Sequence, residues 1–237
     1  MSAYDLIQCD SPESLAGVAA DDWLHSMRSI HQTAGVAFSG GRIARNFLSA
    51  SAQLSQKQGL SLDGVHFFWA DERCVPPNDD ESNFKLAQDN FLAPLQIVPE
   101  NVHRIHGEID PVEAAARSEQ ELRRWHQLVG LDQEVPVLDL IFLGMGEDGH
   151  VASLFPDGPK PGDRTELFIP VKASKPPPQR ITINYQLIRS AREVIVLASG
   201  TGKEHALKTS LNAESDTPLA RVLEMRLKTR IYTDLLL

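Results

Sequence analysis

Short apolar runs alternate with longer segments of helical periodicity along this chain. The apolar runs predict strands at 35–38, 65–70, 138–143, 181–183, 193–198 and 230–232. Between them, helices are predicted at 12–30, 42–57, 82–91, 112–128, 184–189 and 202–211. Around the fourth helix, Leu122, Trp125 and Val129 recur at spacings of three and four, so one face should pack on a sheet. This alternation predicts an α/β fold, a Rossmann-like parallel sheet flanked by helices.

Between residues 156 and 178 the chain is rich in proline, glycine and charge, which predicts a long surface loop or flap. Strands resume beyond it, so we interpret the loop as part of a single domain over residues 1–237. No run reaches the roughly 18 apolar residues of a membrane helix. The first five residues show neither the basic nor the apolar region of a signal peptide. We therefore expect a cytoplasmic protein that does not bind membranes.

Composition and charge narrow the classes of partner. The 237 residues include 42% hydrophobic and 23% charged residues, which is ordinary for a globular protein. A net charge of -9 disfavours nucleic acid as a partner, and it means that an anionic small substrate would need a local cationic pocket. The two cysteines, Cys9 and Cys74, lie far apart, which argues against a disulfide framework or a zinc site. No metal site is expected.

Ligands of open parallel sheets bind beyond the carboxyl ends of the strands, so the turns that follow the predicted strands are the places to look. The first turn is Ser39-Gly40-Gly41, where two glycines open a helix and its amino terminus attracts an anion. A simple tight turn explains this pair about equally well. After the second strand comes Asp71-Glu72-Arg73, which is either a solvated turn with a local ion pair or a cation and a carboxylate at the edge of the sheet.

The stretch from Gly144 to Pro156 is the most informative part of the chain. It follows a strand and places three glycines within six residues, so backbone amides are free to approach a ligand. The same turn holds Asp148 and His150, a carboxylate and a titratable imidazole. We interpret this turn as a working site.

Two further turns carry cations. Arg180 lies at the edge of the strand at 181–183, where a surface arginine is an equally good interpretation. Ser199-Gly200-Thr201-Gly202-Lys203 is a glycine-rich turn that ends in lysine but lacks the spacing of a nucleotide P-loop, and it suits a single phosphate group. Convergence of Arg73, His150, Arg180 and Lys203 on one edge favours a binding site over four separate structural roles.

Taken in order, these segments resemble the 6-phosphogluconolactonases. The matching segments are SGG at 39–41, DER at 71–73 with SN at 82–83, LGMGEDGHVASLFP at 143–156, RITIN at 180–184 and SGTGK at 199–203. The third segment and the DER triplet are lactonase-like; the related glucosamine-6-phosphate deaminases differ at both. The resemblance implies a fold of the NagB/RpiA/CoA-transferase-like type and hydrolysis of 6-phospho-D-glucono-1,5-lactone to 6-phosphogluconate in the oxidative pentose phosphate pathway. It implies no metal and no organic cofactor.

One departure from the family bears on the substrate. The family usually continues SGG with Ser/Thr-Thr-Pro, whereas this chain has Arg42-Ile43-Ala44. Arg42 either contacts a phosphate group directly or fills the site and changes the substrate. Both interpretations stay open from the sequence.

Our mechanistic hypothesis assigns a role to each candidate residue. His150 is the general base that activates water. Asp148 orients either the imidazole or the water, and Arg73 either balances the charge of the developing oxyanion or binds a sugar hydroxyl. Substrate binding is assigned to the following residues: Ser39, Gly40, Gly41, Arg42, Asp71, Gly146, Arg180 and Lys203. A nucleophilic pair of Cys74 and His150 is a weaker alternative, because an activated lactone needs no covalent intermediate.

Two other functions remain as alternatives. One is an aldose–ketose isomerase or deaminase that acts on an amino-sugar phosphate. The other is a non-catalytic sugar-phosphate-binding protein in which Arg42 has rebuilt the pocket. The expected partner is a small phosphorylated sugar lactone, and the chain is expected to be a monomer or a small homo-oligomer.

Overall fold

The computed structural model describes residues 4–28, 33–130, 133–226 and 228–236, and its main element is a parallel sheet of six strands. The strands lie in the order β1-β9-β8-β5-β2-β3. Their bounds are β1 Asp5–Gln8, β2 Ala34–Phe38, β3 Val65–Trp69, β5 Leu140–Gly144, β8 Glu193–Ala198 and β9 Thr229–Thr233. The predicted parallel α/β architecture is confirmed.

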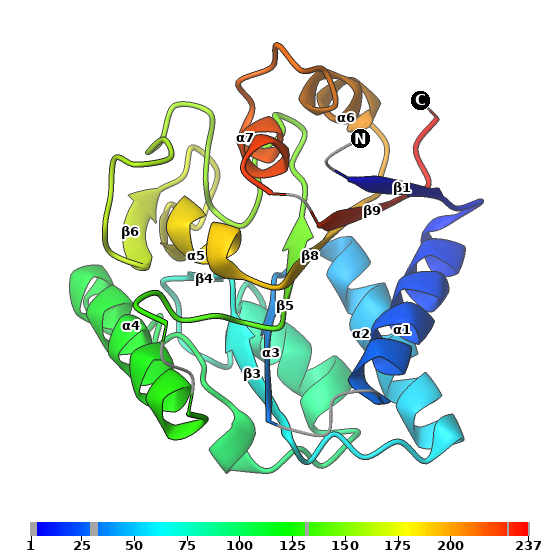
Figure 1. Cartoon of the computed structure of the whole chain (residues 1–237), viewed down its shortest axis with the longest axis vertical. Coiled ribbons are helices and arrows are strands. Elements are labelled where there is room, and N and C mark those ends of the chain that lie inside the picture. The colour runs from blue at the N-terminus through cyan, green and yellow to red at the C-terminus, as the bar shows by residue number, and fades with distance from the viewer. Residues whose placement is uncertain (1–3, 29–32, 131–132, 227, 237) are drawn as a thin grey trace.

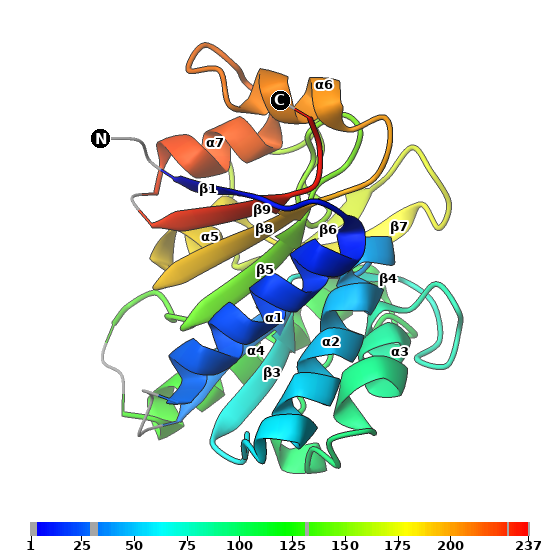
Figure 2. The ribbon, with the colours of Figure 1, turned by 90° about the vertical axis from the view of Figure 1, so that its right-hand side faces the viewer.

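Helices cover both faces of this sheet, which explains why its central strands are continuous apolar runs. Figure 2 shows α1, α2 and α3 on the near face, whereas α4 and α5 lie behind the sheet. Every residue of β2 and of β8 is buried. The helices are α1 Pro12–Arg28, α2 Arg42–Gln58, α3 Asn83–Ala87, α4 Pro111–Leu128, α5 Tyr185–Ser190, α6 Glu204–Ser210 and α7 Pro218–Glu224, with short helical turns at Gln88–Leu92 and Pro99–Asn101.

An aromatic cluster joins the first helix to the sheet. The indole of Trp23 on α1 packs against the rings of Phe38, Phe47, Phe91 and Phe142 at centroid distances of 5.9 to 6.3 Å. Its Nε1 donates a hydrogen bond to the hydroxyl of Ser51, so the polar atom of this buried ring is satisfied.

A second sheet corrects three sequence predictions. Strands β4 (Asp71–Arg73), β7 (Gln179–Ile183) and β6 (Phe168–Lys172) pair antiparallel in the order β4-β7-β6. The strand predicted at 181–183 therefore lies outside the parallel sheet, Asp71 to Arg73 form a strand, and the predicted loop 156–178 contains β6. Pro170 made a strand at 168–172 hard to predict from the sequence. The proline is tolerated because β6 is at the edge of its sheet, where one side of the strand needs no hydrogen-bond donor.

Two further elements were missed, β1 and α7. Strand β1 is short, and three of its four residues are exposed, so it lacks the apolar run that marks the inner strands. Helix α7 begins after Thr217, whose hydroxyl accepts a hydrogen bond from Ala220 N, with Pro218 at its first position. Of the helix predicted at 12–30, residues 29 and 30 lie outside the described residues.

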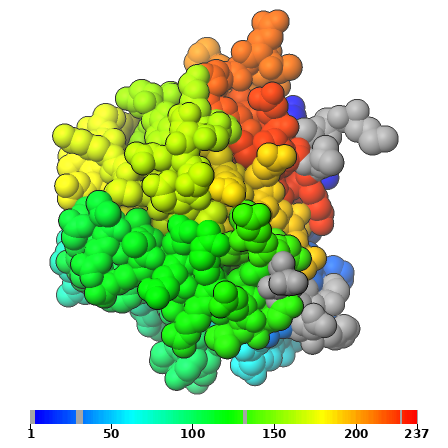
Figure 3. Space-filling model, turned by 60° about the vertical axis from the view of Figure 1, so that its left-hand side comes forward, coloured from blue at the N-terminus to red at the C-terminus, as the bar shows by residue number. Residues whose placement is uncertain are grey.

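Helix α4 packs against the second sheet, as its periodicity predicts. Leu122 and Trp125 are buried, and Val129 packs against the core at the end of the helix. The Trp125 ring meets Phe68 of β3 edge to face at 5.1 Å. Glu119 on α4 accepts a hydrogen bond from Leu167 N, which ties the 156–178 segment to the helix. Figure 3 shows α4 in green with this segment in yellow-green directly above it.

None of the helices in the described part of the chain has the length and hydrophobicity of a membrane span.

Candidate functional site

The turns singled out in the sequence meet at one edge of the parallel sheet. Strands β8, β5, β2 and β3 are consecutive neighbours, and the turns 199–203, 144–150 and 39–41 and the strand β4 follow them at their carboxyl ends. Figure 1 shows this order, with β8 beside β5. A Cβ built on Gly144 would lie 3.5 Å from the carbonyl oxygen of Gly40, so two of the turns touch.

His150 and Asp148 form a hydrogen-bonded pair in the third turn. The imidazole Nδ1 lies 2.6 Å from Asp148 Oδ1, and the backbone amide of His150 donates to the same oxygen at 3.1 Å. Burial alone would raise the pKa of Asp148, but the charge and hydrogen bonds of His150 outweigh it and lower that pKa. An ionised Asp148 accepts a hydrogen bond from Nδ1–H, so the free lone pair of the neutral ring lies on Nε2.

Gly146 leaves the room that the imidazole occupies. A Cβ at this position would lie 2.1 Å from both Nδ1 and Cε1 of His150. The amide of Gly146 donates to the carbonyl of His150 at 2.9 Å, and the amide of Gly149 donates to the carbonyl of Gly146. These amides were expected as donors to the substrate, but here they close the turn on itself, and the visible contribution of Gly146 is steric.

Phe155 contacts both the imidazole and Arg180, a relation that sequence reasoning missed. Its ring centroid is 5.0 Å from that of His150, and the guanidinium of Arg180 lies 5.8 Å from the same ring. Phe155 belongs to the predicted segment 143–156, but only the fold shows that strand β7 brings Arg180 to this ring.

Arg73 and Arg180 face each other across the antiparallel strands β4 and β7. Burial, and then the charge of Arg73, lower the pKa of Arg180. Arg73 donates to the backbone carbonyl of Glu81 and lies 3.5 Å from its carboxylate, whereas its Nε is buried and has no hydrogen-bond partner among the described residues. The carboxylates of Asp71 and Glu81 offset part of the repulsion between the two arginines, and the unpartnered Nε of Arg73 is left as a donor for an anionic group.

A second pair of cations lies where the turn 199–203 meets the start of α2. Burial lowers the pKa of Lys203, and the nearby charge of Arg42 lowers it further, while Glu147 and Asp234 act in the opposite direction. A Cβ on Gly200 would lie 4.0 Å from the Arg42 guanidinium, which places the two segments side by side.

Ser39 adds a free donor beside this second pair. It is buried, and its hydroxyl finds no hydrogen-bond partner within the part of the chain that the structure describes. A buried hydroxyl without a partner is costly, so it points to a bound ligand with acceptor oxygens. Phosphate fits this donor and the two cations.

Asp71 joins two turns of the site. It is buried, its Oδ2 accepts a hydrogen bond from the Ser153 hydroxyl at 2.7 Å, and its Oδ1 accepts one from Asn83 Nδ2 at 3.2 Å. Both carboxylate oxygens of Asp71, which was predicted as a substrate contact, accept hydrogen bonds within the protein. Asn83 was visible in the sequence only as part of the downstream SN, and Ser153 only as part of the third segment.

The thiol of Cys74 does not suit the nucleophilic role weighed above. Burial, together with the negative charges of Glu72 and Asp110, raises the pKa of Cys74 to about 11. The thiol is therefore protonated at neutral pH and is a poor nucleophile.

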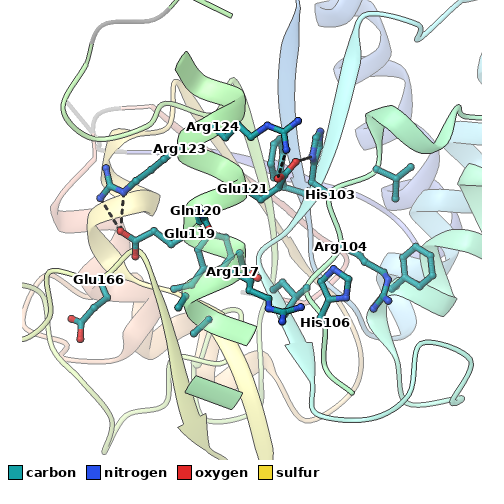
Figure 4. A pocket seen from close by; sticks show the side chains of 18 of the residues that line it. His103, Arg104, His106, Arg117, Glu119, Gln120, Glu121, Arg123, Arg124 and Glu166 are labelled. Carbon is teal, nitrogen blue, oxygen red and sulfur yellow. Dashed lines mark hydrogen bonds and ion pairs between the residues drawn. The ribbon is translucent and has the colours of Figure 1, made fainter. Parts of the chain in front are cut away.

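A large groove of the molecule is lined by other residues. It is a cavity of about 1600 Å³ between α4, residues 97–106 and β6, and it contains none of the predicted site residues (Figure 4). Its arginines are already paired with carboxylates: Arg104 with Glu108, Arg117 with Glu113, Arg123 with Glu119, Arg124 with Glu121 and Arg164 with Glu166. This pairing leaves no surplus charge for a ligand, so we place the candidate site at the edge of the sheet. No cluster of metal-ligating side chains occurs in the described ranges.

Comparisons with known proteins identify the family of this chain. Residues 10–231 match the family described as "Glucosamine-6-phosphate isomerases/6-phosphogluconolactonase". A "Probable 6-phosphogluconolactonase 1" of Arabidopsis thaliana is 41% identical over 65% of this chain and 58% of its own length. A "6-phosphogluconolactonase" of Treponema pallidum is 35% identical over 73% of this chain and 70% of its own length. The chain spans about half to six tenths of the length of several plant and human relatives that it matches.

Solved structures share the fold. A protein titled "devB protein" superposes with a TM-score of 0.87 at 26% identity over 97% of this chain and 96% of its own. A monomeric glucosamine-6-phosphate deaminase of the NagB superfamily superposes with a TM-score of 0.79 at 21% identity over 97% and 96%, which speaks for the fold alone. The expected fold type is confirmed, and the chain belongs to the glucosamine-6-phosphate isomerase/6-phosphogluconolactonase family.

Proposed function

We propose that this protein hydrolyses 6-phospho-D-glucono-1,5-lactone to 6-phosphogluconate in the oxidative pentose phosphate pathway. The observation that carries the proposal is the His150–Asp148 pair, held at 2.6 Å at the edge of the sheet where two pairs of cations also lie. The lactonase names of its relatives and the lactonase-like segment 143–156 support the same reaction.

In the proposed mechanism, Nε2 of His150 takes a proton from a water molecule as the water oxygen attacks the lactone carbonyl. Asp148 keeps Nδ1 protonated and stabilises the imidazolium that forms. The tetrahedral intermediate collapses by breaking its bond to the ring oxygen, which receives the proton from Nε2. Arg73 offsets the negative charge on the carbonyl oxygen.

The phosphate group is assigned to donors and cations at the same edge. We propose that Lys203, Arg42, Ser39 and the amides of Gly40 and Gly41 bind it, and that Arg180 contributes its charge from β7; the electrostatic effect of Arg42 on Lys203 and the unpartnered Ser39 hydroxyl support this assignment. In this proposal Arg42 takes the place of the hydroxyl-bearing residues usual in the family and contacts phosphate directly. Asp71 and Gly146 act by holding the turns and the imidazole in place.

The alternative is a deaminase or isomerase that acts on an amino-sugar phosphate, since the matched family includes both activities. Release of ammonia from glucosamine 6-phosphate would identify it. A non-catalytic binding protein is less favoured, because the hydrogen-bonded His150–Asp148 pair serves proton transfer and is not needed for binding.

We further propose a single domain that works in the cytoplasm as a monomer or a small homo-oligomer. Its partner is then a small phosphorylated sugar lactone. The net charge of -9 supports this choice over nucleic acid or an anionic membrane.

The test is a coupled assay. Glucose-6-phosphate dehydrogenase generates the lactone, and 6-phosphogluconate dehydrogenase reports its hydrolysis above the spontaneous rate. We expect His150→Ala to lower kcat by about 10²–10⁴-fold. The matched control is His106→Ala: its ring lines the groove beside α4 and has no role in the proposed mechanism, so its removal should leave kcat unchanged. Near-normal turnover by His150→Ala would remove His150 as the base, and a folded wild type without activity would refute the lactonase.

A further inference from the structure

Glu72 is a buried carboxylate that the mechanism above does not use. It lies on β4 between Asp71 and Arg73, and its exposed fraction is only 2%. Carboxylates are seldom buried unless a cation or several donors compensate for the lost hydration. The adjacent cation, Arg73, is directed to Glu81 instead. The burial of Glu72 therefore calls for another explanation.

Four hydrogen-bond donors explain why Glu72 can be buried. Oε1 of Glu72 accepts from the backbone amides of Arg73 at 2.8 Å and Asn83 at 2.7 Å. Oε2 accepts from the amide of Phe84 at 2.8 Å and from the hydroxyl of Ser82 at 3.0 Å. Three of these donors belong to consecutive residues, 82–84, where helix α3 begins, so one side chain fixes this segment to β4.

The segment that Glu72 fixes includes Asn83, and Asn83 contacts the turn 39–41, which is the proposed phosphate site. Asn83 Nδ2 donates to the backbone carbonyl of Asp71 at 2.9 Å. Its Oδ1 lies against Gly40, where an added Cβ would come within 1.8 Å of it. Asn83 thus packs directly on the turn Ser39-Gly40-Gly41, and Gly40 is the residue that allows this approach.

Burial raises the pKa of Glu72 to about 7, with a smaller contribution in the same direction from Asp71, although the amides of Asn83, Phe84 and Arg73 lower it. Above this pH the carboxylate is ionised and accepts all four hydrogen bonds. No neutral side chain of the same size offers as many acceptor sites, because a glutamine has one oxygen and two N–H donors.

We propose that Glu72 is a positioning residue for phosphate binding: through residues 82–84 it holds Asn83 against the turn 39–41 and so sets the geometry of that turn. This inference rests on the proposed function only in taking the turn to be a phosphate site. Glu72 itself does not touch the substrate. Its loss should therefore weaken phosphate binding more than it slows the proton transfers at His150.

The experiment compares Glu72→Gln with wild type at about pH 8. We expect the Kd of inorganic phosphate, measured by calorimetry, and the KM of the lactone to rise at least about tenfold, while kcat changes less than about threefold. The matched control is Glu193→Gln, since Glu193 is also buried but pairs with Arg230 at the other end of the sheet. It should lower stability and leave the phosphate Kd unchanged.

A second variant keeps the inference testable if Glu72→Gln folds poorly. Asn83→Ala should weaken phosphate binding to a similar extent, and where both variants fold, the double variant should be no worse than either alone. A phosphate Kd within twofold of wild type in Glu72→Gln or Asn83→Ala would overturn the inference, as would a wild type that binds no phosphate. If the wild type binds phosphate but does not hydrolyse the lactone, the proposed function is wrong, whereas the role of Glu72 in phosphate binding still stands.

Discussion

The imidazole of His150 occupies space that only glycine at position 146 leaves open. We predict that Gly146→Ala displaces the ring and lowers kcat by at least about tenfold, because catalytic groups tolerate little misplacement. The coupled assay measures this, with circular dichroism to confirm folding. The control is Gly17→Ala on α1, where nothing lies within 4 Å of an added Cβ. This variant should gain about 0.5–1 kcal/mol of unfolding free energy and keep full activity. Normal kcat in Gly146→Ala would contradict the packing argument.

The second residue-scale prediction concerns Lys203 and Arg42. Burial and the charge of Arg42 lower the pKa of Lys203, so the lysine loses its proton at a lower pH than an ordinary lysine. Phosphate affinity should therefore fall as pH rises through that lowered pKa. In Arg42→Ala the fall should move to higher pH, because one of the two lowering effects is gone. The measurement is the Kd of inorganic phosphate between about pH 8 and 10, where the ligand's own charge is constant. If the pH dependence of the phosphate Kd is the same in Arg42→Ala as in wild type, the charge of Arg42 does not act on Lys203.

At the scale of elements, α1 packs on the core through a buried face whose largest side chain is Trp23. Trp23 is fully buried among four phenylalanine rings, and Ser51 accepts its hydrogen bond. We predict that Trp23→Ala costs about 3–5 kcal/mol of unfolding free energy, measured by urea denaturation. Val112→Ala, on an exposed side chain, should stay within about 0.5 kcal/mol. A similar small cost for Trp23→Ala would mean that α1 is anchored elsewhere.

The elements predicted from sequence are those with a strong local pattern. Strands such as β5 and β8 are continuous apolar runs, and α4 shows its apolar face through Leu122 and Trp125. Strands β4 and β6 were not predicted, because each forms by pairing with β7 and neither has a local sequence pattern that indicates this pairing. The contact of Phe155 with Arg180 escaped for the same reason: β7 brings together residues from two distant segments.

In the candidate site, too, the features that were predicted are those that depend on local sequence. Asp148 and His150 were predicted because they share one turn, and the four strand ends because parallel strands present them at one edge. The bonds of Asp71 to Ser153 and Asn83 depend on the fold of the second sheet, so the sequence did not indicate that its oxygens are occupied.

Across the whole molecule, the first and last strands depend on each other. β1 is at the edge of the sheet and pairs with β9, where Leu6 is opposite the buried Ile231. We predict that Ile231→Ala speeds hydrogen exchange at the amides of both β1 and β9, while β2 and β3 at the far end keep their protection. Mass spectrometry of exchanged peptides measures this. Uniform acceleration along the whole chain would show that the sheet opens only as one unit.

This pairing has a consequence for how the protein is made. Gln8 donates a hydrogen bond to the carbonyl of Leu235, 227 positions later, so β1 is synthesised long before β9, the strand with which it pairs. Strands β2, β3, β5 and β8, with the turns that carry the candidate site, are all synthesised in between. During translation the site can therefore assemble while the edge beside β8 is still open, and synthesis of β9 is the step that closes it.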